Sequence, residues 1–436
     1  MKIVFYHYGI PSIDIMKKEL LEGIEVGDFI KIIKGTKVYK GTLMPHHRFS
    51  KEELINLKRE DGYNIGIDID ESTDIELIKR RKKSLEEDIE ELELDKNKPK
   101  ISILGTGGTI ASYVDYDTGA VHPAQSAEEM LYSNPEIGEI CFPSVEILFS
   151  KLSEDIEPKD WIIIADKVLD EFRSGAEGVV IAHGTDTMSY TSAALSFLLK
   201  YVPKPIVLVG SQRSSDRPSS DSHLNLLSAI EVAKSELNGV FVVMHDDMSD
   251  DRCAIHRGTK VRKMHTSRRD AFQSINTEPI GYIYPNNGEI EISGHISEIE
   301  EAELCKYGSI EPNVSLIYSN PSLSEDELRS AGEKNKGIVI AGTGLGHVKT
   351  QLIPVIKEIV ENGTHVVMTS QCLYGTVNCN VYSSGRKLIE AGVIPCGDML
   401  PETALVKMMW ALTLDEDLRD TMKSNIAGEL TERRVR

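Results

Sequence analysis

Hydrophobic and polar residues alternate with a period of two through much of the N-terminal region. Residues Val26–Met44 predict a strand, a turn at Lys34–Gly35 and a second strand. Residues 65–69 alternate isoleucine with a small or acidic residue, which predicts another strand. Short strands separated by turn residues are typical of small barrels. Residues 1–78 are therefore predicted to form a β-barrel-like accessory domain.

The pattern breaks at residues 79–99, where 14 of the 21 residues of the sequence KRRKKSLEEDIEELELDKNKP are charged. A basic block precedes an acidic one, and Pro99 marks the end of the segment. This composition is typical of a solvated helix or a linker, so we predict a domain boundary here.

From residue 101 onward, short apolar runs alternate with longer stretches of helical spacing, which is the pattern of parallel βαβ units. We predict two α/β domains, residues 100–290 and 291–436, with a hairpin-containing linker at Glu278–Glu300. The fold class is α/β, with a small β-barrel-like domain in front. The apolar runs predicted to be strands are Ile101–Leu104, Gly178–Ala182, Ile206–Val209, Val240–Met244, Val314–Tyr318, Ile338–Ala341 and Val366–Thr369.

Composition narrows the class of protein. The 436 residues are 40% hydrophobic, which is too apolar for a disordered chain. There is no run of about 18 apolar residues and no signal-peptide pattern, so we expect no membrane span and a cytoplasmic location. Six scattered cysteines without a CxxC pair indicate reduced thiols. A formal net charge of −20 repels polyanions, so a partner would hold most of any nucleic acid.

The first candidate motif is LGTGGTIA at Leu104–Ala111, directly after a predicted strand. It lacks the Gly-Lys-Ser/Thr ending of a phosphate-binding loop, and Ile110 replaces the third glycine of a dinucleotide site. Its glycines let the backbone approach a ligand closely, and Thr106 and Thr109 present hydroxyls at a strand end. The alternative interpretation is a purely structural glycine turn.

The second motif is AHGTDTMSY at Ala182–Tyr190, again directly after a predicted strand. A hydroxyl beside a carboxylate, here Thr185 beside Asp186, can act as a nucleophile with its base. The alternative interpretation is a helix N-cap.

The third motif is RGTKVRK at Arg257–Lys263, a basic cluster in an acidic chain. Lys260 could pair with a buried carboxylate and help to move a proton if its pKa is depressed. The alternative is a solvated charged loop. The histidines show no HxxxH-type ligand set, so no metal site is expected.

The motifs LGTGGTIA, HGTDTM and TKV, in this order, resemble those of the L-asparaginase/glutaminase family. The resemblance covers about residues 100–436 and includes SEDIEPKDW, VGSQR, SDSHLNL, TSQCLYG and MLPETALVK. It implies that Thr109 is the nucleophile and that Thr185, Asp186 and Lys260 form the set that moves protons.

The same resemblance implies a substrate site. Ser153 and Glu154 would hold the α-carboxylate of the substrate, Asp186 would receive its α-ammonium, and Gly108 would lie against it. Glu154 stands where the family has glutamine, and the loop SYVDYDTGAV lacks the family's tyrosine near Ala120–Val121. These departures argue against efficient use of free asparagine.

The N-terminal module and charged linker resemble those of the D subunits of archaeal glutamyl-tRNA(Gln) amidotransferases. That resemblance implies hydrolysis of glutamine and transfer of ammonia to an E subunit. The E subunit would hold glutamyl-tRNA(Gln) and an activation site for ATP and magnesium, so no cofactor is expected in this chain. The family's assemblies imply a homodimer within a heterotetramer.

Three functions remain open at this point. The chain could be the glutaminase subunit of a tRNA-dependent amidotransferase, a free-standing L-asparaginase/glutaminase with an accessory domain, or a non-catalytic subunit with the asparaginase fold. The presence of Thr109, Thr185, Asp186 and Lys260 argues against the third.

Overall fold

The computed structural model forms two compact units, one with the N-terminal strands and one with both α/β domains. No helix within the described ranges is long and apolar enough to cross a membrane. Most of the predicted linker at 79–99 falls on residues 81–93, which lie outside the described residues. The structure describes residues 20–45, 54–59, 64–70, 72–80, 94–108, 112–114, 121–123, 131, 134–213, 219–294 and 302–431.

The N-terminal strands confirm the small β-rich domain. They form a five-stranded antiparallel sheet in the order β4-β3-β2-β1-β5. The first hairpin turns at Gly35–Thr36, one residue later than predicted. Alternating residues such as Ile30 and Ile32 are buried in its apolar core. The strands are β1 (Phe29–Lys34), β2 (Lys37–Met44), β3 (Leu54–Lys58), β4 (Asn64–Asp68) and β5 (Thr73–Lys79), and a separate pair is β7 (Ser112–Val114) with β8 (Val121–Pro123).

An eight-stranded sheet in the order β18-β17-β14-β13-β12-β10-β6-β9 carries the first α/β domain. The strands from β13 to β9 are parallel, and β14, β17 and β18 continue the sheet antiparallel. The hairpin predicted within Glu278–Glu300 is β17–β18, but it extends this sheet instead of forming a linker. The strands are β6 (Lys100–Gly107), β9 (Phe142–Lys151), β10 (Gly178–Ala182), β12 (Pro205–Val209), β13 (Gly239–His245), β14 (Cys253–Arg257), β17 (Gly281–Tyr284) and β18 (Glu289–Ile292).

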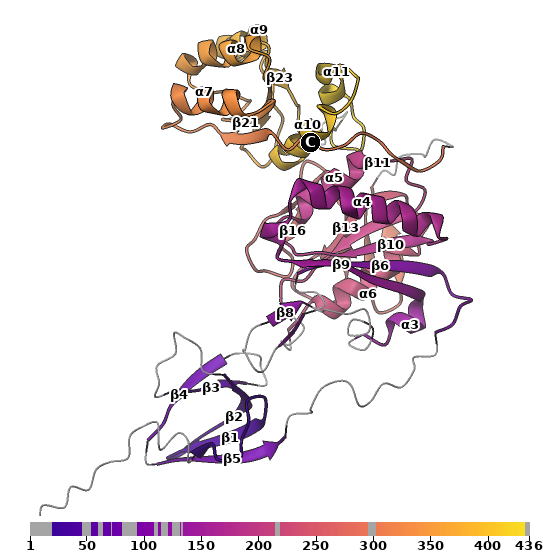
Figure 1. Ribbon diagram of the computed structural model, residues 1–436, viewed down its shortest axis with the longest axis vertical. Helices are drawn as coiled ribbons and strands as arrows, with labels where there is room; N and C mark the ends of the chain where they lie inside the picture. Colours follow the sequence, from indigo (N-terminus) through magenta and orange to yellow (C-terminus); the bar gives the residue numbers. More distant parts are fainter. Residues whose placement is uncertain are drawn as a thin grey trace, which may run out of the picture. The chain divides into compact units, whose positions relative to one another are not determined.

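Helices cover both faces of the parallel strands (Figure 1). Successive residues of a strand point to opposite faces. Val179 and Ile181 therefore pack with α4 and α5, whereas Val180 and Ala182 pack with α3 and α6. The helices are α3 (Ile137–Ile140), α4 (Pro158–Arg173), α5 (Met188–Leu198) and α6 (Ser222–Ala233), with a 3-10 turn η2 (Ser153–Asp155) before α4.

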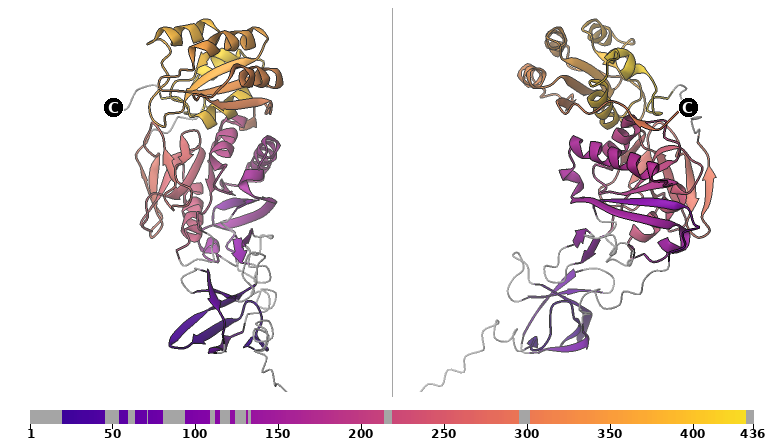
Figure 2. Two further views of the ribbon diagram at one scale, coloured as in Figure 1. Left: turned by 90° about the vertical axis from the view of Figure 1, so that its left-hand side faces the viewer. Right: turned by 45° about the vertical axis from the view of Figure 1, so that its right-hand side comes forward.

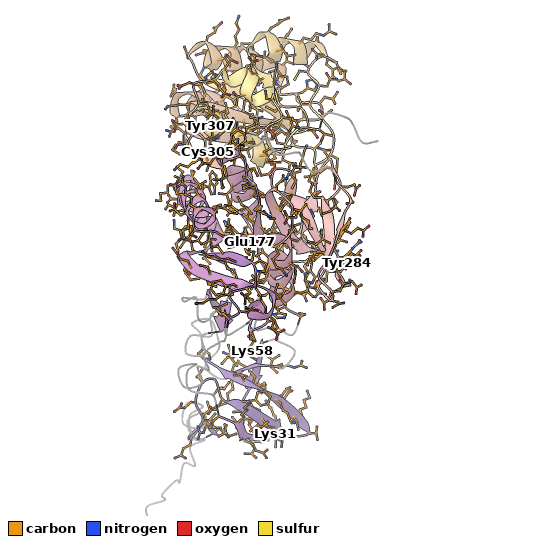
Figure 3. All side chains as sticks on the ribbon, turned by 90° about the vertical axis from the view of Figure 1, so that its right-hand side faces the viewer. Lys31, Lys58, Glu177, Tyr284, Cys305 and Tyr307 are labelled. Atoms are coloured by element: carbon orange, nitrogen blue, oxygen red, sulfur yellow. The ribbon has the colours of Figure 1, made fainter. Side chains whose placement is uncertain are left out.

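Two short ribbons border this sheet. One is the hairpin of β15 (Val261–Lys263) with β16 (Phe272–Ser274). The other pairs β11 (Leu199–Lys200) with β19 (Cys305–Lys306), on the segment that leads to the second α/β domain and carries Cys305 and Tyr307 (Figure 3).

The second α/β domain is a parallel four-stranded sheet in the order β20-β21-β22-β23, between layers of helix (Figure 2). Helix α10 joins it to the first domain, because its Trp410 ring stacks on Phe197 of α5 with centroids 5.5 Å apart. The two α/β domains thus share one apolar core. The elements are β20 (Val314–Tyr318), α7 (Glu325–Lys334), β21 (Gly337–Gly342), η3 (Thr350–Leu352), α8 (Ile353–Glu361), β22 (His365–Ser370), α9 (Ser383–Glu390), β23 (Ile394–Pro395), α10 (Pro401–Ala411) and α11 (Leu418–Lys423).

A buried histidine fixes the carboxyl end of β10. His183 Nδ1 lies 2.6 Å from the carbonyl oxygen of Gly184, so this nitrogen carries the proton. His183 Nε2 then accepts from the Thr191 hydroxyl at 2.9 Å, and Trp161 Nε1 donates to the same hydroxyl at 3.1 Å. Full burial lowers the pKa of His183 to about 4. The turn that follows β10 is thereby tied to α4 and α5.

This histidine makes stability depend on pH in a defined window. Between pH 6.5 and about 4 the unfolded chain binds a proton at His183 and the folded chain does not, so stability falls as the pH falls. Across this pH range, protonation of His183 in the unfolded chain lowers the free energy of unfolding by about 3 kcal/mol. His183→Gln should be less stable than the wild type at pH 7, and urea unfolding should show that gap shrinking by about this amount at pH 4. A gap independent of pH would contradict the neutral, buried imidazole.

Candidate active site

The candidate site lies where three parallel strands end side by side. Strand β6 is flanked by β9 on one side and by β10 on the other. The chain passes from β6 to β9 and then crosses to β10, so the strand order reverses at β6. Open α/β sheets bind ligands at such a point, beyond the carboxyl ends of the strands.

The turns that follow these strands pack closely, with Gly108 against the Gly184 backbone and Gly184 against the Ser153 side chain. A Cβ on Gly108 would lie 2.6 Å from the Gly184 Cα, and one on Gly184 would lie 2.6 Å from the Ser153 Cβ. Gly108 also has φ +84°, which favours glycine. Larger residues would force these turns apart. Thr109 follows Gly108 directly, but it lies outside the described residues.

Thr185 and Asp186 share one lysine ammonium, that of Lys263. Lys263 Nζ donates to Thr185 Oγ1 at 2.8 Å and to Asp186 Oδ1 at 2.8 Å. The Thr185 residue is 9% exposed and the Lys263 side chain 13%, whereas the Asp186 side chain is 65% exposed. The hydroxyl and the ammonium are therefore largely shielded, and the carboxylate reaches solvent.

The assignment of Lys260 to this set was wrong. Its Nζ contacts Asp398 Oδ2 at 2.7 Å, and its side chain is only 2% exposed. Burial lowers the pKa of Lys260, and the Asp398 carboxylate opposes that shift. The lysine that contacts Thr185 and Asp186 is Lys263.

Strand alternation explains the error and could have prevented it. Residue 261 is a buried valine that packs in the shared core. Side chains two positions apart share a face of a strand, so residue 263 points to the same side as Val261, and Lys260 points to the other. Residue type alone does not distinguish two lysines three positions apart.

Ser153 joins the Thr185–Asp186 turn to η2. Its Oγ accepts from the Asp186 backbone N–H at 3.3 Å, and its carbonyl accepts from the Thr187 hydroxyl at 2.6 Å. Ser153 is buried and Glu154 is exposed. The structure thus brings Ser153 together with Asp186, whereas Glu154 only flanks them on η2.

The arrangement can move protons. An ammonium that bridges a hydroxyl and a carboxylate can exchange a proton with the hydroxyl, while the carboxylate stabilises its charged form. No group of His, Cys, Asp and Glu that could hold a metal ion occurs within the described ranges. All six cysteines are free thiols.

Comparison with known families covers almost the whole chain. The Asparaginase, N-terminal family model matches residues 100–297, and the Glutaminase/Asparaginase C-terminal domain matches residues 313–423. The GatD N-terminal domain matches residues 24–78. Among solved structures, the thermostable L-asparaginase from Thermococcus kodakarensis has a TM-score of 0.69 at 38% identity, covering 77% of this chain and 100% of that one. L-asparaginase I from Vibrio cholerae has a TM-score of 0.66 at 30% identity, covering 77% and 99%.

Curated relatives extend this similarity through the N-terminal domain. The glutamyl-tRNA(Gln) amidotransferase D subunit of Pyrococcus furiosus is 52% identical over 420 residues, which cover 94% of this chain and 96% of that protein. The corresponding D subunit of Saccharolobus islandicus is 46% identical over 435 residues, which cover 98% and 97%. The chain therefore belongs to the family of glutamyl-tRNA(Gln) amidotransferase D subunits, in which a small β domain precedes two asparaginase-type α/β domains.

Proposed function

We propose that this chain hydrolyses the side-chain amide of glutamine and supplies the ammonia for converting glutamyl-tRNA(Gln) to glutaminyl-tRNA(Gln). The observation that carries the proposal is the Lys263 ammonium, which lies 2.8 Å from both the Thr185 hydroxyl and the Asp186 carboxylate. The name shared by the relatives of P. furiosus and S. islandicus supports the glutamine-dependent, tRNA-linked role.

In the proposed mechanism the hydroxyl of Thr109 attacks the amide carbon of glutamine. The proton passes through the Thr185 hydroxyl to Lys263, whose ammonium has first released a proton to solvent, and Asp186 stabilises the ammonium that forms again. That proton is returned to the leaving nitrogen, which departs as ammonia. Water then attacks the glutamyl ester by the same route, releases glutamate and restores the Thr109 hydroxyl.

The same cluster would orient the substrate. Asp186 presents an exposed carboxylate to the α-ammonium of glutamine. Ser153, held against the Asp186 backbone, would bind the α-carboxylate together with Glu154 on η2. Gly108 lies against Gly184, the residue before Thr185, and Thr109 follows Gly108 in the sequence. Binding by both α-groups fixes the side-chain amide at the nucleophile.

The proposed partner is an E subunit, which would hold glutamyl-tRNA(Gln) and the ATP- and magnesium-dependent activation site. The formal net charge of −20 fits this division, because a strongly acidic protein attracts little RNA by itself. A homodimer within a heterotetramer and a cytoplasmic location belong to the same proposal.

The second candidate is a free-standing L-asparaginase/glutaminase. The similarity of both α/β domains to solved L-asparaginases at 38% and 30% identity favours it. One methylene separates the two substrates, and it supplies only about 1–3 kcal/mol of discrimination. Measured activity therefore has to decide between them.

Removing one member of the proton-transfer set should abolish hydrolysis without unfolding the chain. Thr109→Val, Thr185→Val, Asp186→Asn and Lys263→Met should each lower kcat/KM for glutamine by about a hundredfold or more, measured as ammonia release. Lys159→Met is the control, because that exposed lysine pairs only with Glu157 in the described structure. Near-normal turnover by the Lys263 or Thr185 variant would refute the assigned roles.

Dependence on the partner separates the two candidate functions. Ammonia release from glutamine by the purified chain should be weak and should rise at least about tenfold when the E subunit and glutamyl-tRNA(Gln) are both added. Asparagine in place of glutamine is the matched comparison. Fast asparagine turnover by the chain alone, unaffected by these additions, would instead establish the free-standing enzyme.

A further inference from the structure

The segment of residues 259–263 presents Lys263 to Thr185 and Asp186 on one face. Its opposite face is attached to the second α/β domain. Lys260 contacts Asp398 at 2.7 Å, and Arg262 contacts Glu402 at 3.1 Å. Both carboxylates lie in the second α/β domain. One face of this segment therefore supplies the site with its lysine, and the opposite face is bound to the neighbouring domain.

The pair of Lys260 and Asp398 is almost fully withdrawn from water, with side chains 2% and 11% exposed. A buried ammonium keeps its place only where a carboxylate compensates for the lost hydration. Asp398 is fixed in turn, because its other carboxylate oxygen accepts from the Thr431 backbone N–H at 3.0 Å. The ion pair is a rigid link between the two α/β domains.

The returning strand of the hairpin is fixed to the same place. Ile275 N–H donates to the Lys260 carbonyl at 2.8 Å. The Asn276 amide donates to the carbonyls of Asp398 at 3.3 Å and Gly375 at 3.1 Å, and Gly375 N–H donates back to Asn276 Oδ1 at 2.8 Å. Asn276 has φ 60°, the left-handed region that costs energy in a residue other than glycine. These contacts hold it there.

Thr259, one residue before Lys260, adds two more bonds to the second domain. Its hydroxyl donates to the Ala427 carbonyl at 3.0 Å, and its carbonyl accepts from the Thr403 hydroxyl at 2.9 Å. The hairpin of β15 and β16 is therefore bound to the second α/β domain at both of its open ends.

We propose that Lys260 and Asp398 are positioning residues, which fix the β15–β16 hairpin to the second α/β domain so that Lys263 Nζ stays on Thr185 and Asp186. Only the expected loss of turnover rests on the proposed function. The positioning of Lys263 by Lys260 and Asp398 does not depend on it. Neither member of the pair touches the reacting groups. A misplacement of about 1 Å in a catalytic group can cost about a hundredfold in rate. The second domain is thus part of the support of an active site built in the first.

The first test compares two buried lysines. Lys260→Met removes the charge and keeps a similar length. Lys407→Met is the matched control, because Lys407 and Glu429 are both 0% exposed, lie 2.5 Å apart and both belong to the second domain. Lys260→Met should lower kcat at least about tenfold with KM nearly unchanged, whereas folded Lys407→Met should keep kcat within about twofold.

The second readout does not need activity. The intact complex or the full chain is labelled with acetic anhydride. Mass spectrometry of its peptides then reports how exposed the Lys263 amine is. In the wild type two hydrogen bonds protect it. In Lys260→Met its labelling rate should rise at least about fivefold, while that of Lys151, which is held by Asp160, should not change. Asp398→Asn should act in the same direction and replaces Lys260→Met if that variant does not fold.

Each outcome decides the inference. The inference is supported if Lys260→Met shows both faster labelling of Lys263 and a lower kcat, and Lys407→Met shows neither. Unchanged labelling, or equal effects in both variants, overturns it, because general loss of stability then explains the data. If the wild type releases no ammonia in any mixture, the proposed function fails, and the labelling result still decides whether Lys260 positions Lys263.

Discussion

The geometry of the candidate site depends on a single ammonium, that of Lys263, which bridges the Thr185 hydroxyl and the Asp186 carboxylate at 2.8 Å each. A cation that is 13% exposed needs such partners, because they replace the water it has lost. These contacts of Lys263 join the turn at the end of β10 to the β15–β16 hairpin. The glycine packing of Gly108 and Gly184 then aligns the strand-end turn that precedes Thr109.

The two α/β domains act as one body around this point. They share an apolar core through α5 and α10, and polar links concentrate at the hairpin that carries the site lysine. His183, beneath the site, is kept neutral by burial and ties the Thr185 turn to α4 and α5. Rigid support of this kind lets few side chains hold a reacting geometry.

The spacing of apolar residues along the sequence was enough to predict the α/β architecture, because buried parallel strands are continuous apolar runs. The site motifs follow these runs directly. Strand β9 was missed, since it is an edge strand with many partly exposed residues. The β17–β18 hairpin was found, but its place in the sheet depends on pairing with β14. Lys263 could have been found from alternation, whereas Asp398, which lies 138 residues from Lys260, could not.

We propose that a threonine, with Lys263 moving its proton, opens the amide through a covalent ester. The most direct measurement is mass spectrometry of the chain, with its partner and tRNA, quenched in acid during turnover of isotope-labelled glutamine. We expect a labelled glutamyl group on the peptide that contains Thr109. Ammonia release with no adduct on a threonine peptide, or an adduct on the exposed Cys372, would contradict it.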